Sequence, residues 1–248
     1  MITRRELADH LHQLLNVDAF QDYCPNGLQV EGKSEIRKLA TAVTASQAAI
    51  DAAVAWGADA LLVHHGFFWR NEPASLVGIK ASRIRALMRA DVNLFAYHLP
   101  LDAHPTFGNN AQLAALLDLQ DDGADSKRIW RTGQLSFPLS MEGFLDRIRR
   151  NLRREPLWLK GRSSDIQRVA WCTGAAQSYF AQAAELGVDV FITGEVSESC
   201  YHVAQETGVH YIAAGHHATE RYGVLALADY LVASYDLEHQ YIELPNPI

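Results

Sequence analysis

Cysteine is scarce in this chain, which has only three in 248 residues. Cys24, Cys172 and Cys200 lie far apart, and none belongs to a C-x-x-C pair. This odd, dispersed set argues against a disulfide framework, so the sequence predicts reduced thiols in a cytoplasmic protein.

Long apolar runs are also missing. No segment approaches the length needed to cross a bilayer, and the first residues lack the apolar core of a signal peptide. They instead predict an amphipathic helix, with Thr3 as its N-cap and Glu6 completing a capping box. We therefore expect a soluble protein with no membrane partner.

Charge is moderate, since 21% of the residues are charged, the net charge is −7 and 48% are hydrophobic. This composition excludes disorder and allows a core for one large domain or two small ones. The acidic balance disfavours nucleic acid as the main partner, because binding to phosphates needs a basic surface.

Sequence patterns for two common mechanisms are absent: the G-x-x-x-x-G-K-[ST] phosphate loop and the G-x-S-x-G elbow. Thr173-Gly174 has a weak phosphate-loop character, and a simple strand-to-helix turn is the alternative. Nucleotide-loop and serine-hydrolase mechanisms are therefore disfavoured.

Apolar runs of strand length alternate with helical patterns, which predicts an α/β architecture with mostly parallel sheets. The predicted strands are Leu39–Thr44, Asp59–His64, Asn93–His98, Val169–Thr173, Asp189–Thr193, His210–Ala214 and Gln240–Leu244. The predicted helices are Ser46–Trp56, Ser82–Ala90, Asn110–Leu117, Gln177–Leu186, Ser199–Thr207 and Thr219–Leu231.

The chain also contains an internal repeat. Leu39–His65 aligns with Val169–Glu195 at a constant offset, and each copy reads as strand, helix, Gly-x-Asp and strand. A chance match is the alternative, but the H-x-x-x-D/E that follows a further strand in each copy favours duplication. The polar segment 120–131 predicts a loop or linker. We therefore expect two similar α/β halves, residues 1–125 and 126–248.

Two adjacent histidines, His64 and His65, end the apolar run Ala60–Val63. Imidazole is a good ligand for divalent metals, and neighbouring residues at a strand exit can turn to different partners. Gly66 permits a sharp turn at the carboxyl end of the strand, where open α/β sheets bind ligands. The alternative is a pair packed at the sheet end and hydrogen-bonded to backbone.

Asp102 follows the next predicted strand, in a segment whose two prolines, Pro100 and Pro105, predict a stiff loop rather than a helix. It is a candidate metal ligand or a turn-forming residue. His98 and His104 in the same segment are further candidates as ligands, as supports of a ligand or as proton carriers.

A second pair, His216 and His217, precedes Glu220. If a helix begins near His216, His216 and Glu220 project from one face, because they are four residues apart. Favourable charge at the helix N-terminus is the alternative reason for Glu220. His217 points elsewhere, and we expect it to play a supporting role.

Together, three imidazoles and two carboxylates at strand exits suit two divalent ions, with Glu220 as the natural bridge. Two ions bring about +4 and the carboxylates about −2, so a residual charge near +2 favours water, hydroxide or an anionic substrate. Such ions activate water, which predicts hydrolysis of a phosphate ester, an amide or a purine-type ring. Ligands without thiolate fit Zn, Fe, Mn or Ni.

At these residues the sequence resembles the NIF3-like family, also called the GTP cyclohydrolase 1 type 2 homologs, and within it the bacterial YbgI type. The resemblance covers almost the whole chain. It rests on Tyr23–Gly32, Val43–Ser46, Gly57–Asp59, Val63–Gly66, His98–His104, Gly108–Asn110, Ile192–Glu195 and Gly215–Glu220.

The resemblance implies two similar α/β domains with facing sheets and a dinuclear metal centre. His64 and Asp102 would hold one ion and His65 and His216 the other, with Glu220 bridging them. A homohexameric ring around a central opening is also implied.

We therefore expect a metal-dependent hydrolase acting on a small anionic substrate, namely a nucleotide, a phosphoester or a cyclic amide, with GTP as a specific subcase. Besides the bridging Glu220, His98 is the candidate for proton transfer or for support of the ligands, and His104 or Glu195 are alternatives.

The competing hypothesis is a non-catalytic ring that binds nucleic acid or a protein partner, with structural metals. A basic cluster could then line the opening, or it could be a solvated helix face. Its members are Arg147, Arg149, Arg150, Arg153 and Arg154.

Overall fold

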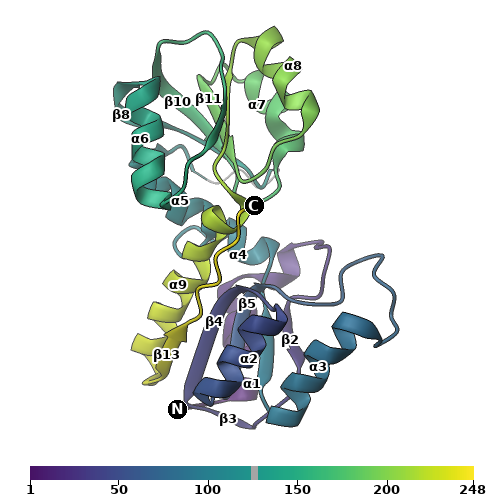
Figure 1. Ribbon diagram of the computed structural model, residues 1–248. Helices are drawn as coiled ribbons and strands as arrows, with labels where there is room; N and C mark the ends of the chain where they lie inside the picture. Colours follow the sequence, from purple (N-terminus) through teal and green to yellow (C-terminus); the bar gives the residue numbers. More distant parts are fainter. Residues whose placement is uncertain (124–127) are drawn as a thin grey trace. The chain divides into compact units, whose positions relative to one another are not determined.

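The computed structural model describes residues 1–123 and 128–248. Its internal contacts divide the chain into two compact units (Figure 1). Unit 1 comprises Met1–Phe107 and Gly223–Pro245, and unit 2 comprises Gly108–Tyr222 and Asn246–Ile248. The units therefore interleave in sequence instead of forming two consecutive halves, because the C-terminal strand pairs within unit 1. The boundary expected between residues 125 and 126 lies outside the described residues.

Unit 1 is built on a five-stranded sheet of order β13-β4-β5-β6-β2, beside a small pair formed by β1 and β3. The first four strands of the larger sheet are parallel, and β2 is antiparallel at its edge. The elements are β1 (Ile2–Thr3), α1 (Arg4–Leu14), η1 (Val17–Ala19), β2 (Gly27–Val30), β3 (Glu35–Ile36), β4 (Lys38–Thr44), α2 (Gln47–Trp56), β5 (Ala60–His65), α3 (Gly78–Ala90), β6 (Asn93–Ala96), α4 (Leu99–Ala103) and β13 (Glu238–Tyr241).

The two faces of this sheet are covered by different helices, because successive side chains of a strand point to opposite sides. Leu61 and Val63 pack with the apolar residues of α2 and α3. Leu62 and Phe95 pack with α1 and with α9 (His216–Tyr235), whose residues from Gly223 on belong to unit 1. The result is a helix–sheet–helix sandwich (Figure 1).

The expected capping box of the first helix is confirmed. Thr3 Oγ1 accepts a hydrogen bond from Glu6 N at 3.2 Å, and Thr3 N donates to Glu6 Oε2 at 3.0 Å. These bonds satisfy amides that have no partner inside the helix.

Unit 2 is built on a six-stranded sheet of order β7-β8-β10-β11-β12-β9. β10, β11 and β12 are parallel, and the outer strands are antiparallel. One face packs against α5 and α6 and the other against α7 and α8. The elements are α5 (Asn109–Leu117), β7 (Leu119–Asp121), β8 (Arg131–Ser140), α6 (Met141–Leu152), β9 (Leu157–Leu159), β10 (Asp165–Trp171), η2 (Gln177–Tyr179), α7 (Phe180–Ala184), β11 (Val190–Thr193), α8 (Glu198–Thr207), β12 (His210–Ala213) and the start of α9.

Three expectations about elements need correction. The sheet of unit 1 is mostly parallel, as expected, whereas in unit 2 only the central strands β10, β11 and β12 are parallel. Part of the segment 120–131 is not a linker, because β7 pairs with β8 and Gln120 lies opposite Gln134; polar side chains suit such an edge strand. The segment after β6 does form a short helix, α4, because Pro100 sits in its first turn, where no amide donor is needed.

The repeated connection is the same in both units. In unit 1, Asp59 Oδ2 accepts from the amides of Arg37 and Lys38, each at 2.9 Å. In unit 2, Asp189 Oδ2 accepts from the equivalent amides at the start of β10, at 2.9 and 2.8 Å. The Gly-x-Asp of each repeat therefore ties the start of one parallel strand to its neighbour.

Two further expectations concern membranes and cysteines. Within residues 1–123 and 128–248, no helix combines the length and the apolarity that crossing a bilayer requires. All three cysteines are reduced thiols with buried side chains.

We predict that Asp59→Asn weakens unit 1 in a pH-dependent way. Burial raises the pKa of the Asp59 carboxyl, but hydrogen bonds from Lys33 and from the amides of Lys38 and Arg37 outweigh it and hold the pKa below its usual range. A lowered pKa stabilises the fold above about pH 4, and this contribution is lost as the pH falls through the folded-state value. The variant should lose about 1–3 kcal/mol at pH 7, the usual cost of hydrogen bonds to a charged group.

Urea unfolding between pH 7 and pH 3, followed by circular dichroism, measures this difference. The gap between wild type and variant should close as the pH falls. Asp51→Asn, an exposed change on α2, serves as the control and should have little effect at any pH. A gap that stays constant with pH contradicts the role of the Asp59 charge.

Candidate metal-binding clusters

The histidines of unit 1 gather where parallel strands end. His64 and His65 are the last residues of β5, and His98 lies two residues beyond the neighbouring strand β6. Gly66 must be a glycine, because a Cβ there would lie 2.5 Å from Ala96 Cβ. The carboxyl ends of parallel strands meet at one edge, so the expected position of these side chains is confirmed.

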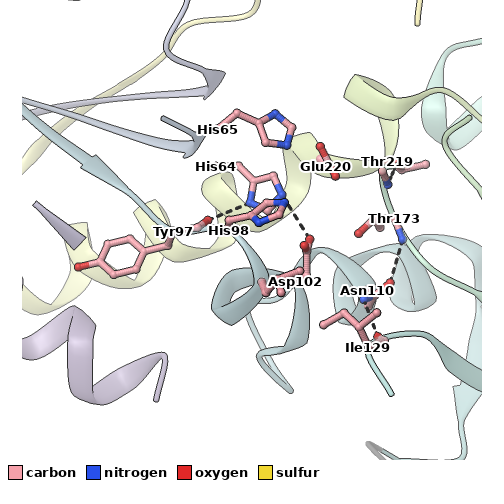
Figure 2. Close-up of polar contacts among 12 residues, drawn as sticks. His64, His65, Tyr97, His98, Asp102, Asn110, Ile129, Thr173, Thr219 and Glu220 are labelled. Atoms are coloured by element: carbon pink, nitrogen blue, oxygen red, sulfur yellow. Dashed lines mark hydrogen bonds and ion pairs between the residues drawn. The ribbon is translucent and has the colours of Figure 1, made fainter. Parts of the chain in front are cut away.

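His64 is fully buried, and both of its ring nitrogens face oxygen atoms. Its Nδ1 lies 2.9 Å from the carbonyl oxygen of Tyr97, and its Nε2 lies 3.4 Å from Asp102 Oδ1 (Figure 2). A carbonyl oxygen only accepts, so Nδ1 carries the proton and Nε2 presents a lone pair in the neutral ring. This is the form of histidine that binds a metal.

Nδ1 of His65 and Nδ1 of His98 also face oxygen atoms, but only the carboxylate beside His98 fixes the ring proton, because the Thr44 hydroxyl beside His65 can donate or accept. His65 Nδ1 lies 3.2 Å from Thr44 Oγ1, and His98 Nδ1 lies 2.7 Å from Asp22 Oδ1. Burial raises the pKa of Asp22, but the hydrogen bond and charge of His98 and further donors outweigh it, so that the pKa stays below its usual range. Asp22 is therefore a carboxylate that orients His98.

Sequence reasoning missed Asp22, although it immediately precedes the Tyr23–Gly32 segment of the family resemblance. Its second oxygen accepts from Asn26 Nδ2 and from Leu99 N, at 2.8 and 2.9 Å. Asn26 Oδ1 in turn accepts from His98 N at 2.7 Å. No spacing in the sequence links this loop to a histidine 76 residues away.

His104 differs from the other candidate histidines. Its Nδ1 accepts hydrogen bonds from the amides of Thr106 and Phe107, at 3.2 and 3.0 Å, and its ring stacks on Phe107. Nδ1 is thus an acceptor, which places the proton of a neutral ring on Nε2. His104 therefore shapes the turn after α4, and a role in support of metal ligands stays a prediction.

In unit 2, His216 and Glu220 lie one turn apart at the start of α9, as expected from their spacing. His216 Nε2 is 3.0 Å from Glu220 Oε2, and its Nδ1 is 2.6 Å from Glu195 Oε1. Burial lowers the pKa of His216, but the two carboxylates outweigh it and raise the pKa to about 9. Without a metal ion, His216 is therefore an imidazolium at neutral pH.

The Thr173-Gly174 turn lies beside this pair and serves as a support. Thr173 N donates to Asn110 Oδ1 at 3.0 Å (Figure 2). Gly174 N donates to Thr219 Oγ1 and Ala176 N donates to Thr193 Oγ1 in β11, each at 3.1 Å. A phosphate loop needs such amides for its ligand, so the structure favours the simple turn.

His217, the second residue of α9, makes a backbone contact. Its amide donates to the carbonyl oxygen of Ile248 at 3.3 Å, and its side chain is half-buried. Its supporting role toward a metal stays a prediction.

These observations define an α/β protein in which each unit carries imidazole and carboxylate groups suited to metal ions at the ends of parallel strands. The sequence profile described as Duf34/NIF3 (NGG1p interacting factor 3) matches residues 2–247, and the chain belongs to that family.

Relatives and solved structures agree with this assignment. A GTP cyclohydrolase 1 type 2 homolog of Yersinia pestis is 52% identical over 243 residues, with 98% of each chain covered. A structure described as protein ybgI, of unknown function, is 48% identical with a TM-score of 0.96 over the whole of both chains. TTHA1606 from Thermus thermophilus is 34% identical, with a TM-score of 0.91 over both whole chains. The expected family and its two-domain α/β fold are confirmed.

We predict that Gly174→Ala disturbs the His216–Glu220 pair. Gly174 has φ +70°, and a Cβ would lie 3.0 Å from Glu220 Cδ and 3.3 Å from His216 Nε2. Gly187→Ala is the matched control, since Gly187 has φ +68° with nothing within 4 Å of an added Cβ. Both changes should cost about 1–2 kcal/mol of backbone strain, and only Gly174→Ala should also weaken the binding of added Zn²⁺.

Urea unfolding measures the strain, and isothermal calorimetry measures the binding of Zn²⁺. Equal Zn²⁺ affinities for the two variants would show that the close approach of Gly174 to Glu220 has no bearing on a metal.

Proposed function

We propose that the protein is a metal-dependent hydrolase with a dinuclear centre. Its ligands are His64 and Asp102 for one divalent ion and His65 and His216 for the other, with Glu220 as the bridge. The metals are Zn, Fe, Mn or Ni, since the ligands are imidazole and carboxylate without thiolate.

One observation carries this proposal: every imidazole in the proposed ligand set has its Nδ1 engaged by an oxygen. The partners are the carbonyl of Tyr97 for His64, the hydroxyl of Thr44 for His65 and the carboxylate of Glu195 for His216. Metal-binding histidines almost always have such a partner, which orients the ring and makes the other nitrogen a better ligand.

His210 shows what a structural histidine looks like in the same chain. Its Nδ1 accepts from Trp158 Nε1 and from Gly161 N, and its Nε2 lies 2.8 Å from the carbonyl oxygen of Ser163. Because Nδ1 accepts from these donors, the ring proton lies on Nε2 and faces a carbonyl oxygen, so neither nitrogen of His210 has a lone pair to offer a metal. In His64 and His216, by contrast, Nδ1 faces an oxygen acceptor, and the oxygen beside Nε2 belongs to another proposed ligand, Asp102 or Glu220.

Burial of the two carboxylates supports the same proposal. Asp102 is 6% exposed in unit 1, and Glu220 is 3% exposed in unit 2. A buried carboxylate costs several kcal/mol unless a positive charge compensates it. Divalent ions supply that charge, and when bound they make water a nucleophile and polarise the substrate.

Two further roles, orienting the imidazole rings and carrying protons, belong to other residues. Glu195 orients His216 and Asp22 orients His98, each through Nδ1. His98 is our candidate for carrying a proton to or from the substrate, because its ring lies beside those of His64 and His65, at 5.1 and 5.8 Å between centroids.

An anionic substrate suits the centre, since two ions and two carboxylates leave a net charge of about +2. The candidates are nucleotides, phosphoesters and cyclic amides. The name of the Yersinia pestis relative supports a nucleotide ring as one of them.

We predict that Glu220→Gln lowers metal content and hydrolysis together, because an amide oxygen cannot bridge two cations as a carboxylate does. Metal affinity should fall by more than about 10–100-fold, the loss seen when a mere support of a ligand is removed. Elemental analysis of freshly purified protein and a screen against the three substrate classes measure both effects.

Glu198→Gln, an exposed change on α8, is the control and should leave both quantities unchanged. Two ions per chain and wild-type turnover in Glu220→Gln would exclude the bridging role.

The proposal includes a homohexameric ring, implied by the family resemblance, with a mass six times the 27.6 kDa of the chain. The alternative of a ring that binds nucleic acid is not favoured by the arginines of α6. Arg149 donates to Glu142, Asp146 and Glu155 at 2.6–2.8 Å, and Arg147 donates to the carbonyl oxygen of Leu117. Native mass spectrometry tests the ring, and a smaller mass would contradict it.

A further inference from the structure

Three imidazoles converge within unit 1 alone. One ring nitrogen from each of His64, His65 and His98 lies within 4.8 Å of the others. The ring centroids are 4.5 Å apart for His64 and His65, 5.1 Å for His64 and His98, and 5.8 Å for His65 and His98. Three imidazoles on one tetrahedral ion, with metal–nitrogen bonds of about 2.0–2.1 Å, have centroids about 5 Å apart. The cluster therefore already has the spacing of a three-histidine metal site.

All three rings are compatible with the polarity that such a site requires. Each Nδ1 faces an oxygen that can accept its proton, namely a carbonyl, a hydroxyl and a carboxylate, and this arrangement leaves each Nε2 as the ligand atom. The bond from His98 to the Asp22 carboxylate is the shortest of the three, at 2.7 Å. A carboxylate–histidine pair of this kind makes the imidazole a stronger metal ligand.

Aromatic side chains hold the cluster on another side. Trp69 meets His98 edge-on at 5.0 Å between centroids and lies 5.9 Å from His65. Trp69 therefore restricts both rings, and an apolar neighbour of this kind controls the access of solvent to a metal site.

A neighbouring group, formed by Asp22, Cys24 and His98, is the weaker site. Burial, with the charge of Asp22, raises the pKa of the Cys24 thiol to about 12. A metal needs the thiolate, whose formation is therefore costly at neutral pH. Asp22 is also already committed to His98 Nδ1.

We propose that unit 1 by itself binds one divalent transition-metal ion through His64, His65 and His98, with Asp22 as the positioning residue. This site is the first to load. The proposal rests on the proposed function only in sharing His64 and His65 with the dinuclear centre. In the single-ion state His98 is a ligand; in the two-ion state His64 and His65 hold separate ions, and His98 is released to carry a proton.

The test uses the full chain with His216→Ala and Glu220→Gln combined, which removes the proposed ligands of unit 2. Titration with Co²⁺ in the presence of a chromogenic chelator should show one ion bound per chain. Proton NMR of the Co²⁺ form should show three hyperfine-shifted exchangeable signals, one for each Nδ1–H. Adding His98→Ala should remove one signal and weaken Co²⁺ binding by more than about 100-fold, beyond the effect of losing an outer partner.

Two further variants in the same background sharpen the result. Asp22→Asn should weaken Co²⁺ binding by about 10–100-fold and keep three signals. His12→Ala, a change at a partly exposed histidine on α1, should change neither quantity. Circular dichroism of each metal-free variant checks folding, and Asp22→Asn tests the site should His98→Ala not fold.

The proposal is overturned if the combined variant binds no Co²⁺, or if His98→Ala leaves its affinity and signal count unchanged. The proposed function fails separately, if the wild-type chain loaded with two ions hydrolyses none of the three substrate classes.

Discussion

Parallel pairing of strands is the constraint on which both clusters depend. β4, β5 and β6 in unit 1 and β10, β11 and β12 in unit 2 run in the same direction, so their carboxyl ends reach one edge of each sheet. Asp59 and Asp189 tie the opposite ends of these strands together. Because these carboxylates hold the starts of neighbouring strands together, the register between the strands is fixed. The side chains at the carboxyl ends of the strands therefore have fixed neighbours.

Those exits then carry buried charge, which must be balanced inside each unit. In unit 2 the single positive charge of the His216 imidazolium faces the two carboxylates of Glu220 and Glu195, which raise its pKa to about 9 despite burial. This raised pKa adds stability that is complete below about pH 6.5 and disappears as the pH rises through 9. A divalent ion on Nε2 would replace the proton and add one further positive charge, which would neutralise both carboxylates. The same carboxylates that hold the proton therefore prepare the ring for a metal, and binding should release protons.

Much of this arrangement could be predicted from the sequence, because the signals are local. The central strands have strong apolar runs, His64 and His65 directly follow one of them, and the i, i+4 spacing of His216 and Glu220 requires only a helix. The edge strands β2, β7 and β9 are three or four residues long and too short for a periodic pattern. Asp22 escaped detection because its partner is distant in the chain and close only after β2 and β6 pair. α4 escaped because proline disfavours helix interiors but not first turns.

The polarity at Nδ1 is what separates ligands from structural histidines, and no sequence pattern shows it. His64 and His104 are both histidines near strand exits of unit 1. The first faces a carbonyl oxygen and the second faces two amides, so their ring protons sit on opposite nitrogens. A histidine that faces an acceptor through Nδ1 keeps its Nε2 lone pair for a cation, whereas one that accepts through Nδ1 presents a proton there instead. The groups around each strand exit thus decide which imidazoles can offer a lone pair to a cation: a backbone carbonyl oxygen does so for His64, and a side-chain carboxylate does so for His216.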